Sequence, residues 1–145
     1  MRADFYLLSR DPVEAALPRI ARSVKGAGER LLVVSDDAGQ LAALDKALWE
    51  QFPEDFLAHG MAGEAHAARQ PLLLGQAYTE ENEARFVAFA DGVWRDEGFG
   101  FERALLFFDE AGRTGARETW RLFDERDDVT REFHELDGGK WVQKA

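Results

Sequence analysis

The sequence of 145 residues contains no cysteine. This absence excludes a disulfide framework, a thiolate metal site and a cysteine nucleophile, and it fits a reducing compartment. No apolar run approaches the roughly 20 residues that span a bilayer. The opening residues, MRADFYLLSR, lack the long apolar core and the cleavage site of a signal peptide. We therefore expect a cytoplasmic protein that does not associate with membranes.

Catalytic motifs are also missing. There is no GxxxxGK phosphate loop and no GxSxG nucleophile elbow. Gly26-Ala27-Gly28 precedes a predicted strand, so we interpret it as a turn. His59 and His66 flank Glu64 in a glycine-rich segment, but a metal site needs three or four converging ligands. We favour unrelated loop histidines, and we expect no catalytic residue, no metal and no cofactor. His134 alternates with apolar residues and is predicted to face solvent.

Positive charge is scarce as well. The chain carries 28 acidic and 18 basic residues, a net charge of −10. Such a field repels nucleic acid at long range and argues against a non-specific DNA-binding protein. A local cluster of basic residues is still compatible with this net negative charge. For anion binding, the positions of the arginines therefore matter more than their number.

What is present is an ordinary globular composition, 46% hydrophobic and 32% charged, of a length typical of one domain. Short apolar runs alternate with stretches of helical periodicity, a pattern typical of α/β folds with right-handed crossovers. The predicted strands cover residues 4–8, 31–34, 71–74, 85–90 and 103–108, with 130–136 as an edge strand. The predicted helices run from Asp11-Pro12 to about residue 24, from Ser35-Asp36-Asp37 to near Phe52-Pro53, and over 111–126. Residues 57–69 and 77–84 are expected to be loops, and 137–139 a turn.

Arginines cluster on the last predicted helix. Arg113, Arg117 and Arg121 are spaced four residues apart, which places them on one ridge of a helix. Trp120 neighbours that ridge. Because arginine can grip a carboxylate through two parallel hydrogen bonds, the cluster is a candidate anion site with an aromatic wall. The alternative is a solvated face, with Arg121 paired to Glu118 or Glu125 and Trp120 in the core.

A second feature is the aromatic segment from Trp49 to Phe56, at the end of a predicted helix and in the loop after it. These side chains either cap the core or form an exposed patch for a partner. Their spacing alone slightly favours the core.

Taken together, these residues resemble the chi subunit family of the bacterial DNA polymerase III holoenzyme. The resemblance is carried in order along the chain by Phe5-Tyr6-Leu7-Leu8, Asp45-Lys46-Ala47-Leu48-Trp49, Phe56, His59, Ala62-Gly63-Glu64, Arg117-Glu118-Thr119-Trp120-Arg121 and Trp141. It implies one Rossmann-like α/β domain over residues 1–145, with a mostly parallel central sheet flanked by helices. It also implies a non-catalytic accessory protein of the clamp loader.

The resemblance assigns partners to both features. Arg113, Arg117, Trp120 and Arg121 would bind the acidic C-terminal tail of single-stranded DNA-binding protein (SSB), which ends in Pro-Phe. Arg117 would hold its terminal carboxylate. Trp49 and Phe56 would face the psi subunit, another clamp-loader component or a helicase. Contact with DNA would then be indirect, through SSB, without sequence-specific binding.

Two other hypotheses remain. One is a nucleotide- or small-molecule-binding α/β protein that uses strand ends near Ser35-Asp36, as open α/β sheets often do. The other is a hydrolase built on the segment that contains His59, Glu64 and His66.

Overall fold

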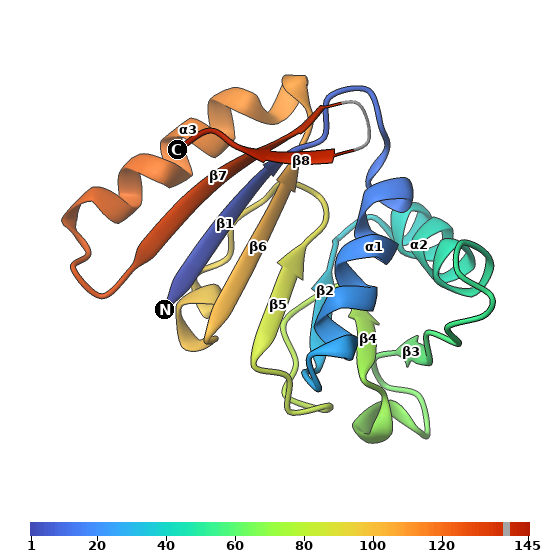
Figure 1. Cartoon of the computed structure of the whole chain (residues 1–145). Helices are drawn as coiled ribbons and strands as arrows, with labels where there is room; N and C mark the ends of the chain where they lie inside the picture. Colours follow the sequence, from blue (N-terminus) through green and yellow to red (C-terminus); the bar gives the residue numbers. More distant parts are fainter. Residues whose placement is uncertain (138–139) are drawn as a thin grey trace.

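The computed structural model describes residues 1–137 and 140–145, which build one eight-stranded sheet with helices on both faces (Figure 1). The strands are β1 (Arg2–Leu7), β2 (Leu31–Val34), β3 (His59–Met61), β4 (Leu72–Gly75), β5 (Phe86–Phe89), β6 (Arg103–Phe108), β7 (Thr130–Asp137) and β8 (Lys140–Gln143). The α-helices are α1 (Val13–Gly26), α2 (Ala38–Glu50) and α3 (Arg113–Leu122). Short 3₁₀ turns are η1 (Ala67–Arg69), η2 (Asp96–Gly100), η3 (Glu110–Gly112) and η4 (Phe123–Glu125).

The strands are ordered β3-β4-β2-β5-β6-β1-β7-β8 across the sheet. Every neighbouring pair is parallel except β7 and β8, which are antiparallel. The predicted α/β class with a mostly parallel, Rossmann-like sheet is thereby confirmed. No helix within the described ranges is long and apolar enough to cross a bilayer.

Two apolar layers sandwich the sheet. Helices α1 and α2 cover one face, where the stripe of α1 packs through Val13, Leu17 and Val24. Helix α3 covers the other face, over β1, β6 and β7. A strand covered on both faces is apolar at every position, which explains why all four residues of β2 are buried.

The helix starts follow local chemistry. The side chain of Asp37 accepts hydrogen bonds from the amides of Gly39 and Gln40, so it caps α2 as predicted. The prediction for α1 is displaced by one residue. Pro12 is its N-cap, without a side-chain hydrogen bond, and Asp11 lies outside the helix.

Three predictions about the strands need correction. The predicted loop 57–69 contains β3, a short edge strand beside β4. Strand β7 is an interior strand, because the C-terminal residues return as β8 and pair with it. His134 on β7 packs against Tyr6, with ring centroids 4.9 Å apart, so it does not face solvent. The predicted turn at 137–139 includes residues 138 and 139, which lie outside the described ranges.

The predicted helix over 111–126 is also shorter than expected. Regular α-helix covers Arg113–Leu122, and a 3₁₀ turn flanks each end. Gly112, a residue of low helix propensity, lies at the junction of η3 and α3.

Candidate peptide-binding site

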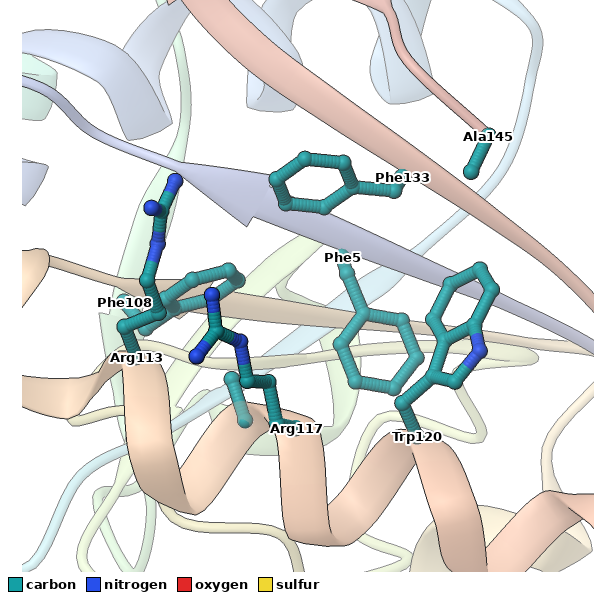
Figure 2. A pocket seen from close by; sticks show the side chains of 8 residues that line it. Phe5, Phe108, Arg113, Arg117, Trp120, Phe133 and Ala145 are labelled. Atoms are coloured by element: carbon teal, nitrogen blue, oxygen red, sulfur yellow. The ribbon is translucent and has the colours of Figure 1, made fainter.

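A pocket of about 320 Å³ opens between α3 and the strand layer. Figure 2 shows the guanidinium groups of Arg113 and Arg117 extending from the helix toward the strands, with Phe133 across from them and Trp120 near the C-terminal end of α3. The lining residues are Phe5, Phe108, Arg113, Ala116, Arg117, Trp120, Phe133 and Ala145. The pocket therefore joins a cationic rim to apolar walls.

The apolar walls come from the strand register. Phe5 of β1 lies opposite Phe133 of β7, so both side chains point to the face that α3 covers. The ring of Phe108, at the end of β6, stacks on Phe133 with centroids 6.1 Å apart. The indole of Trp120 meets Phe5 edge-on at 5.1 Å. Four aromatic rings from three strands and one helix thus enclose the apolar part of the pocket.

The two rim arginines differ in their pairing. Arg113 lies 3.5 Å from the carboxylate of Glu110, an exposed side chain on the preceding turn. In the described part of the chain, no carboxylate forms a salt bridge with Arg117. An unpaired guanidinium beside an apolar pocket is suited to a carboxylate that carries an apolar side chain.

Arg121 does not line the pocket. A step of four residues turns an α-helix about 40° past a full turn, so Arg121 is rotated about 80° from Arg113. Over residues 1–137 and 140–145, Arg121 forms no salt bridge with Glu118 or Glu125, the pairing that the alternative interpretation required. The structure therefore brings Arg113, Arg117 and Trp120 together and leaves Arg121 exposed beside them.

Sequence reasoning missed the strand side of the pocket. Phe108 and Phe133 come from β6 and β7, and Ala145 follows β8. Backbone hydrogen bonds join residue 145 to Phe133 and place it at the rim. No local pattern marks these residues, because their proximity depends on strand order.

The second predicted feature is exposed. Trp49 is 47% and Phe56 is 71% solvent-accessible, and their rings meet edge-on at 6.2 Å. The core interpretation drawn from spacing is therefore wrong for these two residues. Phe56 has a φ of +48°, and its carbonyl accepts a hydrogen bond of 2.7 Å from the Lys25 ammonium. The backbone thus adopts a sparsely populated conformation while the ring projects into solvent.

His59 lies buried beside the indole of Trp49. Its Nδ1 is 2.7 Å from the carbonyl oxygen of Leu57, and its Nε2 is 2.9 Å from Oδ1 of Asp45. Both ring nitrogens are therefore occupied by protein acceptors. His66 is exposed on the turn beyond, and Glu64 accepts from the amide of Met61. This arrangement does not gather His59, Glu64 and His66 into a hydrolytic centre.

A cluster that sequence reasoning did not find lies on the face opposite α3. Asp4, Glu132 and His134 bring their ligand atoms within 4.8 Å of one another, a spacing compatible with a cation. However, guanidinium groups already neutralise it, since Arg2 pairs with both carboxylates and Arg103 pairs with Asp4. The arrangement is that of an ion-pair network linking β1, β6 and β7.

This network also affects Tyr6. Burial, followed by the negative charge of Asp4, raises the pKa of Tyr6 to about 12. Its phenol oxygen accepts a hydrogen bond of 3.3 Å from Arg103. The phenol therefore stays neutral through the physiological range.

The crevice at the carboxyl ends of the strands is acidic. It lies where β1, β5 and β6 end, and its lining includes the carboxylates of Asp11, Glu14, Asp91 and Asp109. Ser35 and Asp36 are not among its lining residues. Arg95 compensates the charge of Asp91. The carboxylates of Asp11, Glu14 and Asp109 disfavour a phosphate-bearing ligand, because like charges repel in a partly enclosed space.

The chain matches the family described as "DNA polymerase III chi subunit, HolC" over residues 1–129. It is 35% identical over 77 residues to the DNA polymerase III subunit chi of Escherichia coli (strain K12), a match covering 48% of this chain and 52% of that protein. It is 29% identical over 73 residues to the protein of the same name from Haemophilus influenzae, covering 48% and 51%. The chain thus spans about half the length of the curated relatives it matches.

Proposed function

The chain belongs to the DNA polymerase III chi subunit family, and on that premise we propose that it is a non-catalytic accessory protein of DNA replication. It binds the acidic C-terminal tail of SSB and links that tail to the clamp-loader complex. Residues 1–145 act as one chi-like α/β domain. The observation that carries the proposal is the pocket in which the unpaired guanidinium of Arg117 faces aromatic walls.

Each part of the pocket has a role in this proposal. Arg117 holds the terminal carboxylate of the tail through paired N–H donors. The terminal phenylalanine ring enters the space between Trp120, Phe5 and Phe133. Arg113 and the exposed Arg121 attract the aspartates that precede it, an interaction that mainly accelerates encounter.

The expected affinity is modest. A short flexible tail loses conformational freedom on binding, and this entropy offsets part of the contact energy. We expect a micromolar dissociation constant, about −8 kcal/mol in binding free energy. Because the charged contacts are exposed, salt weakens the complex.

The exposed pair Trp49 and Phe56 supplies the second contact, with a psi subunit or another clamp-loader component. Support comes from its position. The pair lies at the end of α2 and in the segment that leads to the edge strand β3, whereas the peptide pocket lies near β7 at the other end of the sheet. Two partners can therefore bind at once without overlapping.

The competing hypothesis is a nucleotide- or small-molecule-binding protein. The acidic lining of the strand-end crevice favours the adaptor, since nucleotides carry negative charge. Titration with a panel of nucleotides separates the two hypotheses. Saturable binding of a nucleotide to the folded wild type would support the small-molecule hypothesis, and no binding across the panel would count against it.

The direct test uses a fluorescent Asp-rich peptide ending in Pro-Phe. Its binding is measured by anisotropy for the wild type, Arg117→Ala and the control Arg69→Ala, which removes an exposed arginine near the opposite edge of the sheet. We expect saturable binding by the wild type and the control, and at least about a tenfold loss for Arg117→Ala, as for a charge-assisted contact. A folded wild type that fails to bind would contradict the proposal.

A further inference from the structure

Arg131, on strand β7, contacts Trp120 at both its ring and its backbone. The guanidinium carbon lies 4.6 Å from the centroid of the indole ring. Its Nη1 donates a hydrogen bond to the backbone carbonyl of Trp120, and its Nη2 donates to the carboxylate of Asp124. One side chain therefore ties the wall of the pocket to the strand layer and to the turn that follows α3.

Arg131 lies behind that wall. It precedes Phe133 by two positions on β7, so the two side chains point to the same face of the sheet. Phe133 lines the pocket, but Arg131 does not. The indole of Trp120 therefore contacts both Phe5, edge-on at 5.1 Å, and Arg131.

The charge of Arg131 is already engaged. The carboxylate of Asp124 compensates it, so little field remains to attract an acidic ligand. Its planar guanidinium instead lies over the indole while its two Nη atoms donate to separate acceptors. A lysine ammonium does not reproduce this arrangement, because it has no planar face to place against the ring. This geometry indicates that Arg131 acts by fixing the position of the Trp120 indole rather than by attracting the ligand electrostatically.

We propose that Arg131 is a positioning residue that fixes the Trp120 indole before a ligand arrives, so that the pocket selects peptides whose last residue is aromatic. This inference rests on the proposed function of the pocket as a peptide site. Its physical basis is preorganisation, since a wall that is already immobile loses no rotamer entropy on binding. Without Arg131, the indole must be ordered during binding, and this entropy loss lowers the affinity for a peptide with an aromatic C-terminal residue.

Arg126 offers a matched control. Its guanidinium lies 3.9 Å from the ring of Phe99 and pairs with Asp128, so it shares the aromatic and carboxylate contacts of Arg131. It does not line the pocket, and its stacking partner does not either. Arg126→Gln thus removes the same charge and the same kind of contact elsewhere.

The experiment measures binding of two Asp-rich peptides, one ending in Pro-Phe and one in Pro-Ala, to the wild type, Arg131→Gln, Arg131→Lys and Arg126→Gln. Both Arg131 variants are expected to bind the Pro-Phe peptide roughly fivefold more weakly, whereas Arg126→Gln stays within about twofold of the wild type. Their affinity for the Pro-Ala peptide is expected to change much less. In a Trp120→Leu background, Arg131→Gln should have no further effect.

A second readout is independent of peptide. The indole N–H of Trp120 gives its own ¹⁵N signal, assigned with Trp120→Phe, and this signal should shift or broaden in both Arg131 variants but not in Arg126→Gln. Wild-type affinity in Arg131→Lys would show that charge suffices and would overturn the inference, as would equal losses for the two peptides. If the wild type binds neither peptide, the proposed function fails and the selection role fails with it. The indole signal then decides the positioning role alone.

Discussion

The indole of Trp49 lies over the buried imidazole of His59, with 4.2 Å between the ring centroids. One residue comes from α2 and the other from β3, so this contact joins the end of a helix to the edge of the sheet. The half-exposed indole thereby rests on a side chain whose two nitrogens are held by Leu57 and Asp45. His59 therefore packs against Trp49 and helps to fix the position of its exposed indole.

Replacing His59 should therefore destabilise the protein. His59→Ala removes a buried ring and leaves the carbonyl of Leu57 without its hydrogen bond, at a cost of about 2–3 kcal/mol. Urea unfolding of the variant and the wild type measures this difference. His66→Ala is the matched control, since His66 is exposed, and it should lie within about 0.5 kcal/mol of the wild type. Equal stability of the two variants would contradict the supporting role of His59.

The two proposed surfaces should act independently. Trp49→Ala with Phe56→Ala should abolish binding of the clamp-loader partner but leave affinity for the Pro-Phe peptide within about twofold, because distant sites are additive. Arg117→Ala should show the opposite pattern. Calorimetric titrations of each partner, alone and in the presence of the other, check this. Competition between the partners would disprove separate surfaces.

Low pH should lower the free energy of unfolding partly through protonation of Asp91. Burial alone would raise its pKa, but hydrogen bonds from Arg95 and from the amides of Asp36 and Val93 outweigh burial and lower it. Because the pKa of Asp91 is lower in the folded state than the unfolded-state value of 3.8, its carboxylate stabilises the fold at pH values above 3.8. This stabilisation is lost as the pH falls through the folded-state pKa.

The wild-type free energy of unfolding should thus fall more steeply than that of Asp91→Asn as the pH decreases below about 5, through the range in which the folded Asp91 carboxylate takes up its proton. Denaturant titrations at each pH measure both curves. Parallel curves would show that Asp91 has the same pKa in the folded and unfolded states.

High pH should destabilise the folded protein through ionisation of Tyr6. Its pKa of about 12, raised mainly by burial, exceeds the unfolded value of 10.0. The resulting stabilisation is complete below pH 10.0 and is lost as pH rises through about 12. Tyr78→Phe leaves Tyr6 as the only tyrosine, since the sequence has two. Its tyrosinate absorbance should then rise with a midpoint near 12 or at alkaline unfolding. A midpoint near 10.0 in folded protein would contradict the burial of Tyr6.

The sequence alone determined the elements whose signals are local. The run 31–34 is apolar at every position, and the stripe of α1 repeats at helical spacing, so both were predicted where the structure has them. The cationic half of the candidate site is local too. Arg113, Arg117 and Trp120 share a helix, and fixed helical geometry converts their spacing into one side of a pocket.

Only the tertiary structure decided what strand order brings together. Phe133 reaches Phe5 because β7 pairs with β1, about 130 residues away along the chain. The exposure of Trp49 and Phe56 depends on how the segment after α2 crosses to β3, so spacing alone misplaced them in the core. No local sequence pattern marks Arg131. Its contact with Trp120 forms only because the fold places β7 beside α3. The physical reason is that helical periodicity constrains neighbours within a few residues, whereas contacts between strands depend on the energy of the whole packed sheet.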